Sequence, residues 1–581
     1  MTPARGAVHV SAIVAAILVA QACAKTSTRP APRLGALVSA YDREVTPYHP
    51  FTASEAGRRQ YDRVLANYLG EEYRTGLAAL CSRYLTELRR IDPATLDERE
   101  RVTRDIFEFN LDACLERLRL PWHLLPIDQV GRSLPSEFAV MGAGRGVHPF
   151  KTPRNYEDFL GRVDGFVTWI DTAISNMRAG MAQDITQPRD IMVKVLPQLE
   201  THIVPDPRAS VFYEPIKNLP KDFDDTTRSV LTEKYVRAIE GQVVPAYRRL
   251  STFVRDEYLP RCRSTFGLAD LPGGHAMYAF AVRVGTTTSL SPEQISALGE
   301  QEVVRISGEI DRLRAEIAAA GEAPPARYAS VEDLLRAYAD FRASVEATLP
   351  GLFRRFPKAG FEIRPIEAFR ERSMPSSYVP ASLDGARAGV FYLNAAALRE
   401  GGGVAISRNL FLHEAVPGHH LQMTLQRENR GLPGFRRFGW YNAFGEGWAL
   451  YAESLGAELG VYGNRHDRLS MLGAELFRAK RLVVDVGLHA KGWTREQAIA
   501  YLGGSREDSE REAERYMAWP GQALGYKIGQ LKILDMRRRA EAALGASFDL
   551  RDFHDALLED GGMPLSVLET KMERWIAGRR R

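Results

Sequence analysis

The chain has 581 residues, and its 77 lysines and arginines nearly balance its 73 aspartates and glutamates, giving a formal net charge of +4. Because so small an excess is spread over so long a chain, the charge gives no reason to expect a nucleic-acid partner. A body of about 550 residues is long enough for several domains, but it also fits one large helical enzyme with two lobes.

Residues 1–22 have the pattern of an export signal. One positive charge precedes an apolar run over residues 8–20, and small residues follow it. The run is too short to span a bilayer comfortably, which favours a cleaved signal over a transmembrane helix. We therefore expect an exported protein, with residues 23–34 as a flexible tether and residues 35–581 as a single large domain.

Cys23 decides between two modes of export. The segment Ala20–Cys23 resembles a bacterial lipobox, in which the cysteine is lipidated and becomes the first residue of the mature chain. This interpretation predicts a lipoprotein anchored to a membrane through Cys23, and the alternative is a secreted periplasmic protein without an anchor. No other apolar run in the sequence is long enough to cross a membrane.

The remaining cysteines are Cys81, Cys114 and Cys262. Three cysteines allow at most one intramolecular bridge, which argues against a disulfide scaffold. None of them lies in a C-x-x-C pair, so cysteine is not the expected metal ligand.

Helical periodicity covers most of the chain. Apolar residues recur every three or four positions over residues 34–119, and residues 155–199 and 224–258 have the same amphipathic pattern. Ser291, followed by a proline, predicts the N-cap of a long helix that runs through Ala319. We therefore expect a mostly α-helical protein.

The composition changes between residues 361 and 394. Residues 361–364 and 389–394 have strand-like composition, and Ser382–Gly385 supplies turn residues between them. We interpret these segments as a small antiparallel sheet. Its edge could bind an extended peptide through main-chain hydrogen bonds, or it could be an ordinary hairpin that covers the core.

Candidate metal ligands follow directly after this sheet, in the run from Phe411 to His420. Two histidines and a distal glutamate form the ligand set of a hydrolytic zinc site, and Glu414, next to His413, is the expected general base. Position 417, four residues after His413, is a proline, which cannot ligate and distorts a helix. An unbroken helix would return His420 to the face of His413, whereas a local bulge would return His419.

A second acidic cluster begins at Glu446. Glu446 and Glu453 are seven residues apart and therefore share one helical face. Glu446 is the candidate third ligand, and Glu453 could orient a ligating histidine. The alternative is that the histidines only cap or pack a kinked helix and that Glu453 is a solvated charge.

The two clusters together resemble the DUF885 proteins, which are grouped with the gluzincin-type metallopeptidases. The resemblance implies a large two-lobed, helical, metallopeptidase-like fold with a deep active-site cleft beside the small sheet. It also favours His419 over His420 as the second ligand. The segments that carry it are His413–His419, Glu446–Glu453, Gly273–Gly274, Ser382–Gly385, Phe391–Asn394 and Pro520–Ala523 with Tyr526 and Gly529.

The expected chemistry is hydrolysis by a water bound to Zn²⁺. His413, His419 and Glu446 would hold the zinc, and Glu414 would take the proton from the water and deliver it to the leaving group. Hydroxyl groups must hold the developing oxyanion, and we expect Tyr526 first and Tyr516 second, with a structural role as the alternative for each. Tyr378 and Tyr392 could line the cleft from the side of the sheet, with His420 and Glu453 beside the ligands.

The leading hypothesis is thus a zinc peptidase that cleaves peptides. Two alternatives remain open. One is a catalytically impaired peptide-binding lipoprotein on a peptidase-like scaffold, in which the inserted Pro417–Gly418 has spoiled catalysis. The other is a hydrolase of non-peptide amides.

Overall fold

The computed structural model describes residues 33–130, 133–146, 148–367, 371, 375–381, 387–399 and 401–580. The predicted signal, Cys23 and nearly all of the tether lie outside the described residues, as does the predicted turn Ser382–Gly385. Within the described ranges no helix combines the length and the apolar character needed to cross a bilayer. The chain is mostly helical, as expected.

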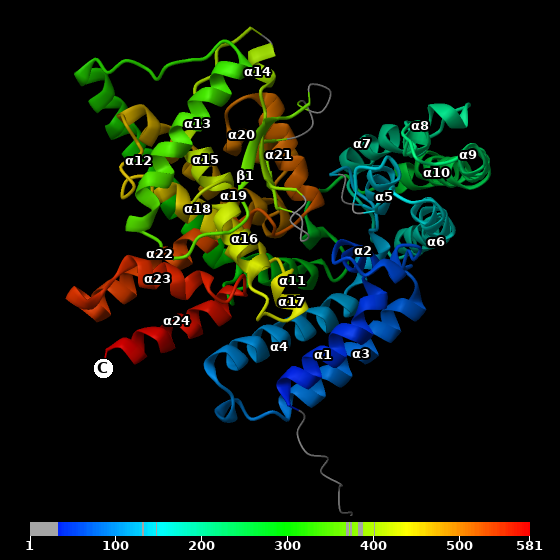
Figure 1. Ribbon diagram of the computed structural model, residues 1–581, viewed down its shortest axis with the longest axis horizontal. Coiled ribbons are helices and arrows are strands. Elements are labelled where there is room, and N and C mark those ends of the chain that lie inside the picture. The colour runs from blue at the N-terminus through cyan, green and yellow to red at the C-terminus, as the bar shows by residue number, and fades with distance from the viewer. Residues whose placement is uncertain are drawn as a thin grey trace, which may run out of the picture.

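An N-terminal group of helices packs around its own apolar core (Figure 1). The disulfide Cys81–Cys114 joins two of these helices, and Cys262, farther along the chain, is a free, half-buried cysteine. Asp97 caps the longest helix by accepting a hydrogen bond from the backbone N–H of Glu100. The group consists of α1 (Leu34–Val45), α2 (Pro50–Glu55), α3 (Glu71–Arg89) and α4 (Glu98–Arg119).

The next helices form a second group, on the right in Figure 1. Stacked aromatic rings fill its core, with Phe138 lying 4.2 Å from Phe166 between ring centroids. The group consists of α5 (Leu134–Gly142), α6 (Pro153–Met181), α7 (Arg189–Glu200), α8 (Glu214–Lys217), α9 (Asp225–Ala238) and α10 (Val244–Phe253).

The rest of the chain forms the largest group, which contains both candidate clusters (Figure 1). Ser291 caps its long helix α12, as predicted, and accepts a hydrogen bond from the backbone N–H of Gln294. The helices are α11 (Gly274–Thr286), α12 (Pro292–Ala320), α13 (Val331–Thr348), α14 (Ala396–Arg399), α15 (Arg408–Glu414), α16 (His419–Glu428), α17 (Gly434–Arg437), α18 (Asn442–Ser454), α19 (Arg465–Ala490), α20 (Arg495–Leu502), α21 (Arg506–Ala518), α22 (Leu524–Leu544), α23 (Leu550–Leu558) and α24 (Leu565–Arg579).

The small sheet is mixed, so the prediction of an antiparallel sheet is wrong for its two longer strands. β1 (Phe361–Pro365) pairs in parallel with β3 (Gly389–Leu393). β2 (Ser377–Val379) pairs antiparallel with β3 on its other side. No pattern in the sequence indicated β2, because three half-exposed residues are too few to show an alternation. The connection that was interpreted as a hairpin turn therefore contains an edge strand.

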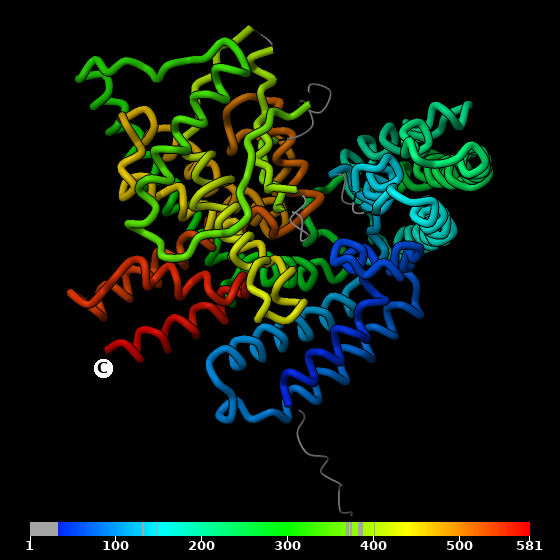
Figure 2. The backbone as a smooth tube through the Cα atoms, in the orientation of Figure 1, coloured from blue at the N-terminus to red at the C-terminus, as the bar shows by residue number. Residues whose placement is uncertain are grey.

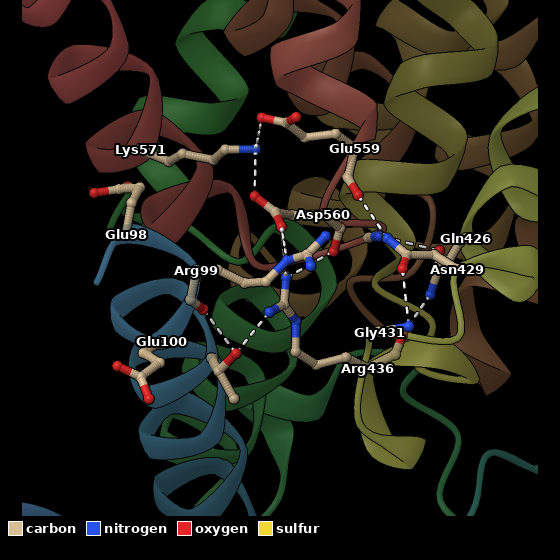
Figure 3. A network of polar contacts seen from close by, with 12 residues as sticks. Glu98, Arg99, Glu100, Gln426, Asn429, Gly431, Arg436, Glu559, Asp560 and Lys571 are labelled. Atoms are coloured by element: carbon tan, nitrogen blue, oxygen red, sulfur yellow. Dashed lines mark hydrogen bonds and ion pairs between the residues drawn. The ribbon is translucent and has the colours of Figure 1, made fainter. Parts of the chain in front are cut away.

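A buried polar junction fastens the first helices to the last ones (Figure 3). The guanidinium of Arg436 in α17 donates to Thr103 Oγ1 in α4 and to the backbone oxygen of Asp560, at 2.7 Å each. Lys571 in α24 lies 2.8 Å from the Asp560 carboxylate, which also accepts from Arg99. In Figure 2 the α4 and α24 tubes lie side by side at the lower edge of the molecule.

Candidate metal centre

The helix that carries His413 ends one residue later, at Glu414, and α16 begins at His419. Between them the chain turns over residues 415–418, so the distortion expected at Pro417 is a complete break rather than a bulge. A Cβ atom at Gly418 would lie 1.9 Å from the backbone oxygen of His413. Only glycine fits there, and this close return of the chain brings His419 back beside His413.

Glu446 comes from α18, which packs closely on α22. A Cβ atom at Gly447 would lie 2.4 Å from the Cα of Gly529, so the two backbones touch where both residues are glycine. This contact fixes the position of the helical turn that carries Glu446 along the axis of α22. The ligand position is therefore set by the backbone packing of two long helices.

The structure brings His413, His419 and Glu446 together. The Nε2 atoms of the two histidines each lie 3.5 Å from Oε2 of Glu446, and all three potential ligand atoms lie within 4.8 Å of one another. Two ligands about 2 Å from a tetrahedral zinc are roughly 3.3 Å apart. The spacing and the donor types therefore fit a divalent ion such as zinc.

The electrostatics of the cluster also favour a cation. Burial alone would lower the pKa of His413, but its hydrogen bonds to Glu446 and Glu453 outweigh burial and raise that pKa to about 9. Burial acts to raise the pKa of Glu446, yet the two imidazoles hold it far below its usual range. Protein groups at this point thus attract positive charge, whether it comes as a proton or as a metal ion.

Glu453 orients His413 from behind. Its Oε1 lies 2.9 Å from Nδ1 of His413, and its Oε2 accepts a hydrogen bond from Asn409. Arg478 lies 3.8 Å from the same carboxylate and helps to lower its pKa against the effect of burial. Because Glu453 occupies Nδ1, the Nε2 atom of His413 faces the cluster. By contrast, Nδ1 of His419 has no hydrogen-bond partner among the described residues.

His420 points to the sheet instead of the cluster. Its Nδ1 lies 2.8 Å from the hydroxyl of Tyr378, and its ring packs 4.6 Å from the ring of Phe361. Burial, helped by the charge of Arg342, lowers the pKa of His420 to about 4, so this imidazole is neutral. Both His420 and the Tyr378 ring therefore connect α16 to the sheet.

Glu414 is buried beside the cluster. Burial raises its pKa, and the nearby His413 and His419 oppose that effect. The backbone of Tyr378, in edge strand β2, also opposes the effect of burial on this pKa. Strand β2 thus lies beside the candidate base and contacts His420 through the Tyr378 hydroxyl.

The remaining predicted tyrosines lie in three different settings. Tyr526 in α22 lies one turn before Gly529, whose backbone contacts Gly447 next to Glu446, and the charge of Glu446 adds to burial in raising the pKa of this tyrosine. Tyr516 is fully buried, and its hydroxyl donates to Glu512 at 2.7 Å. Tyr392 lies on the face of β3 opposite to Phe391, and Phe391 is the residue paired with Tyr378. The structure therefore brings Tyr526, but neither Tyr516 nor Tyr392, to the cluster.

Three side chains near the cluster were missed by the sequence analysis. Trp440 is 46% exposed, and its ring lies 5.9 Å from that of His419. Arg478 contacts Glu453 from α19, and Arg481, one turn later on the same helix, stacks on Tyr526 at 4.6 Å. Single arginines on an amphipathic helix carry no motif, so no pattern in the sequence could have distinguished them from solvated charges.

The fold and the site define a mostly helical protein with a buried cluster of two histidines and a glutamate. The model of a family described as "Bacterial protein of unknown function (DUF885)" matches residues 50–572. The chain therefore belongs to the DUF885 family.

Two solved structures are similar over nearly the whole chain. The first, "the putative lipoprotein from Colwellia psychrerythraea", is 27% identical with a TM-score of 0.84 and covers 94% of this chain and 99% of its own. The second, "a putative lipoprotein of unknown function from Shewanella oneidensis", is 18% identical with a TM-score of 0.70 and covers 94% and 100%. The second likeness concerns the fold alone. The comparison with curated proteins gave no match.

Proposed function

We propose that this protein is a gluzincin-type zinc hydrolase that cleaves peptide bonds. The observation that carries the proposal is the meeting of His413 Nε2, His419 Nε2 and Glu446 Oε2, at spacings that suit a tetrahedral zinc. Two histidines and one carboxylate leave a fourth position open, as in catalytic rather than structural zinc sites.

A zinc ion bound there would acidify a water molecule and polarise a carbonyl group. Glu414 is the group that receives the proton and later delivers it to the leaving amine. Its buried position and raised pKa suit it to hold a proton between these two transfers. The backbone of Tyr378 in β2 lies beside this carboxylate and limits the rise in its pKa.

Tyr526 is the side chain best placed to donate to a developing oxyanion. It comes from α22, which is in backbone contact with α18 at Gly447 and Gly529, so Tyr526 and Glu446 keep a constant separation. Its raised pKa keeps the phenol protonated and able to donate near neutral pH. The hydroxyl of Tyr516 already donates to Glu512, which leaves Tyr516 a supporting role.

We further propose that the protein is exported. The two similar structures are described as those of lipoproteins, which agrees with the lipobox-like segment at Cys23. A lipid anchor at Cys23 would place the hydrolase on a membrane surface of the periplasm, with residues 23–34 as the tether.

The decisive test compares metal content and peptide cleavage in Glu414→Gln. We expect about one zinc per chain in both the variant and the wild type. We also expect kcat to fall by about 10²–10⁴-fold, because only the proton acceptor is lost. Glu507→Gln, at an exposed glutamate of α21, serves as the matched control. Chelation should abolish cleavage, and products should be identified by mass spectrometry from a mixed peptide library.

Full activity in Glu414→Gln would exclude this base. Tight peptide binding by a zinc-free wild type without turnover would favour the binding-protein alternative. Cleavage of amides other than peptides would show that the substrate class, but not the chemistry, is wrong.

A further inference from the structure

Arg481 in α19 is a buried cation whose hydrogen-bonding capacity is only partly used. The side chain is 9% exposed, and its guanidinium lies 4.6 Å from the ring centroids of both Phe477 and Tyr526. Its Nη2 lies 3.3 Å from Oε2 of Glu512. Its Nε and Nη1 atoms have no acceptor within the described part of the chain. Buried donors without acceptors are costly, so they point to a missing partner.

The surroundings of Arg481 do not balance its charge. Oε2 of Glu512 also accepts from Arg515 at 2.8 Å and from the Tyr516 hydroxyl at 2.7 Å. Two guanidinium groups thus share one carboxylate, and Arg515 directs a further donor to the neutral Gln522. One positive charge is left over at this point. The missing partner of Arg481 is therefore an anion.

This cation adjoins the candidate metal centre. Tyr526 connects the two, because its ring stacks on Arg481 and it lies one turn before Gly529, whose backbone contacts Gly447 next to Glu446. A substrate group bound at Arg481 would therefore lie one aromatic ring away from the reacting bond. Planar carboxylates are the preferred partners of guanidinium groups in such sites.

We propose that Arg481 binds a carboxylate of the substrate and thereby selects short peptides that carry one close to the scissile bond. The carboxylate can be the free C-terminus of the peptide or an acidic side chain. This inference rests on the proposed function for the identity of the substrate, but the anion site itself requires no turnover.

Equilibrium binding tests the inference without catalysis. Isothermal titration calorimetry would compare N-acetyl-Ala-Ala as free acid and as C-terminal amide, using zinc-loaded Glu414→Gln. N-acetyl-Ala-Glu amide and N-acetyl-Ala-Gln amide test the side-chain source. In at least one pair we expect the peptide with the carboxylate to have a Kd lower by about tenfold or more. This is the change in affinity that one hydrogen bond to a charged group produces. Repeating the titrations with chelated wild-type protein removes any dependence on a variant.

Arg481→Gln should abolish that preference and leave binding of the amide peptides unchanged. Arg468→Gln, the same change at an exposed arginine of α19, should keep the preference. Equal affinity for acid and amide in both pairs would overturn the inference, as would a preference that survives Arg481→Gln. Carboxylate-dependent binding without any cleavage would uphold the anion site and reject the hydrolase. Peptide cleavage with the same rate for acid and amide substrates would uphold the hydrolase and reject the anion site.

Discussion

The candidate metal centre and the junction of Figure 3 are both buried polar clusters, yet they differ in how donors and acceptors are arranged. At the junction most donors meet acceptors, although Nε of Arg436 has none among the described residues. Arg436, Lys571 and Arg99 all point at Asp560 or at neighbouring oxygens. At the candidate metal centre two imidazole nitrogens and a carboxylate oxygen converge, and once both imidazoles are deprotonated all three are acceptors.

A cluster in which donors face acceptors carries no excess of either charge and needs no ion, whereas converging acceptors need a cation. Without a metal the centre satisfies this need with a proton, which is why the pKa of His413 is about 9. Both clusters are buried and charged, so burial and charge alone do not distinguish a structural cluster from a binding site. The balance of hydrogen-bond donors and acceptors does. The following experiments test that distinction.

The largest effect should come from removing one acceptor. His419→Ala is expected to reduce bound zinc from about one per chain to almost none, with cleavage falling to the level of chelated protein. His420→Ala is the matched control, because this neighbour bonds to Tyr378 and not to the cluster. The measurement is metal analysis after dialysis. Equal zinc loss in both variants would contradict the assignment of ligands.

Breaking the junction should cost stability but leave the metal in place. Arg436→Met removes the bonds to Thr103 and Asp560 and should lower the free energy of unfolding by about 3 kcal/mol. Arg574→Met removes an exposed pair with Glu98 between α24 and α4, and should cost less than ~1 kcal/mol. Denaturant unfolding measures both. Zinc loss in Arg436→Met would show that the two clusters are not independent.

Removing the support behind His413 should weaken metal binding without abolishing it. Glu453→Gln keeps the size of the side chain but loses its charge, and we expect a 10–100-fold lower zinc affinity. Competition with a chromophoric chelator measures the change. Glu458→Gln, at an exposed glutamate that follows α18, should leave the affinity unaltered. An unchanged zinc affinity in Glu453→Gln would show that metal binding by His413 does not depend on the charge of Glu453.

The smallest effect is the pH dependence of zinc binding. The folded-state pKa of His413 is about 9, above its ordinary value of 6.5, so this group stabilises the metal-free fold below pH 6.5. That contribution disappears as pH rises through 9. Zinc must displace the proton, so its apparent affinity should rise about tenfold per pH unit up to pH 9. His420→Ala should show the same slope, because the pKa of His420 is already about 4. A flat profile would exclude a protonated His413.

The sequence indicated which residues of the two clusters would meet. His413, Glu414, Glu446 and Glu453 were candidates because each cluster places histidine or glutamate side chains at short local spacings, and the structure brings them together. The choice between His419 and His420 could not be made from helical periodicity, since the chain breaks at Pro417 and the period is lost. There, only the family resemblance favoured His419.

What the sequence could not predict depends on contacts between distant segments. Arg481 stacks on a tyrosine 45 positions later, and Arg478 reaches a glutamate on another helix. Contacts between residues far apart in the chain produce no periodic pattern in the sequence. Likewise, the helical class and the cap at Ser291 were predicted from local rules, whereas the order of strands in the sheet was not.

The contact of Gly447 with Gly529 has a consequence for how this centre can vary. With only hydrogen atoms between the two backbones, neither helix can slide or roll without collision. Substitutions at the exposed Trp440 leave this contact intact, whereas a change in the position of Glu446 would require both helices to move. The turn before His419 is equally constrained, because a side chain at Gly418 would collide with the backbone of His413. Adapting the site to another cation would therefore have to change the ligand side chains and not the backbone that carries them.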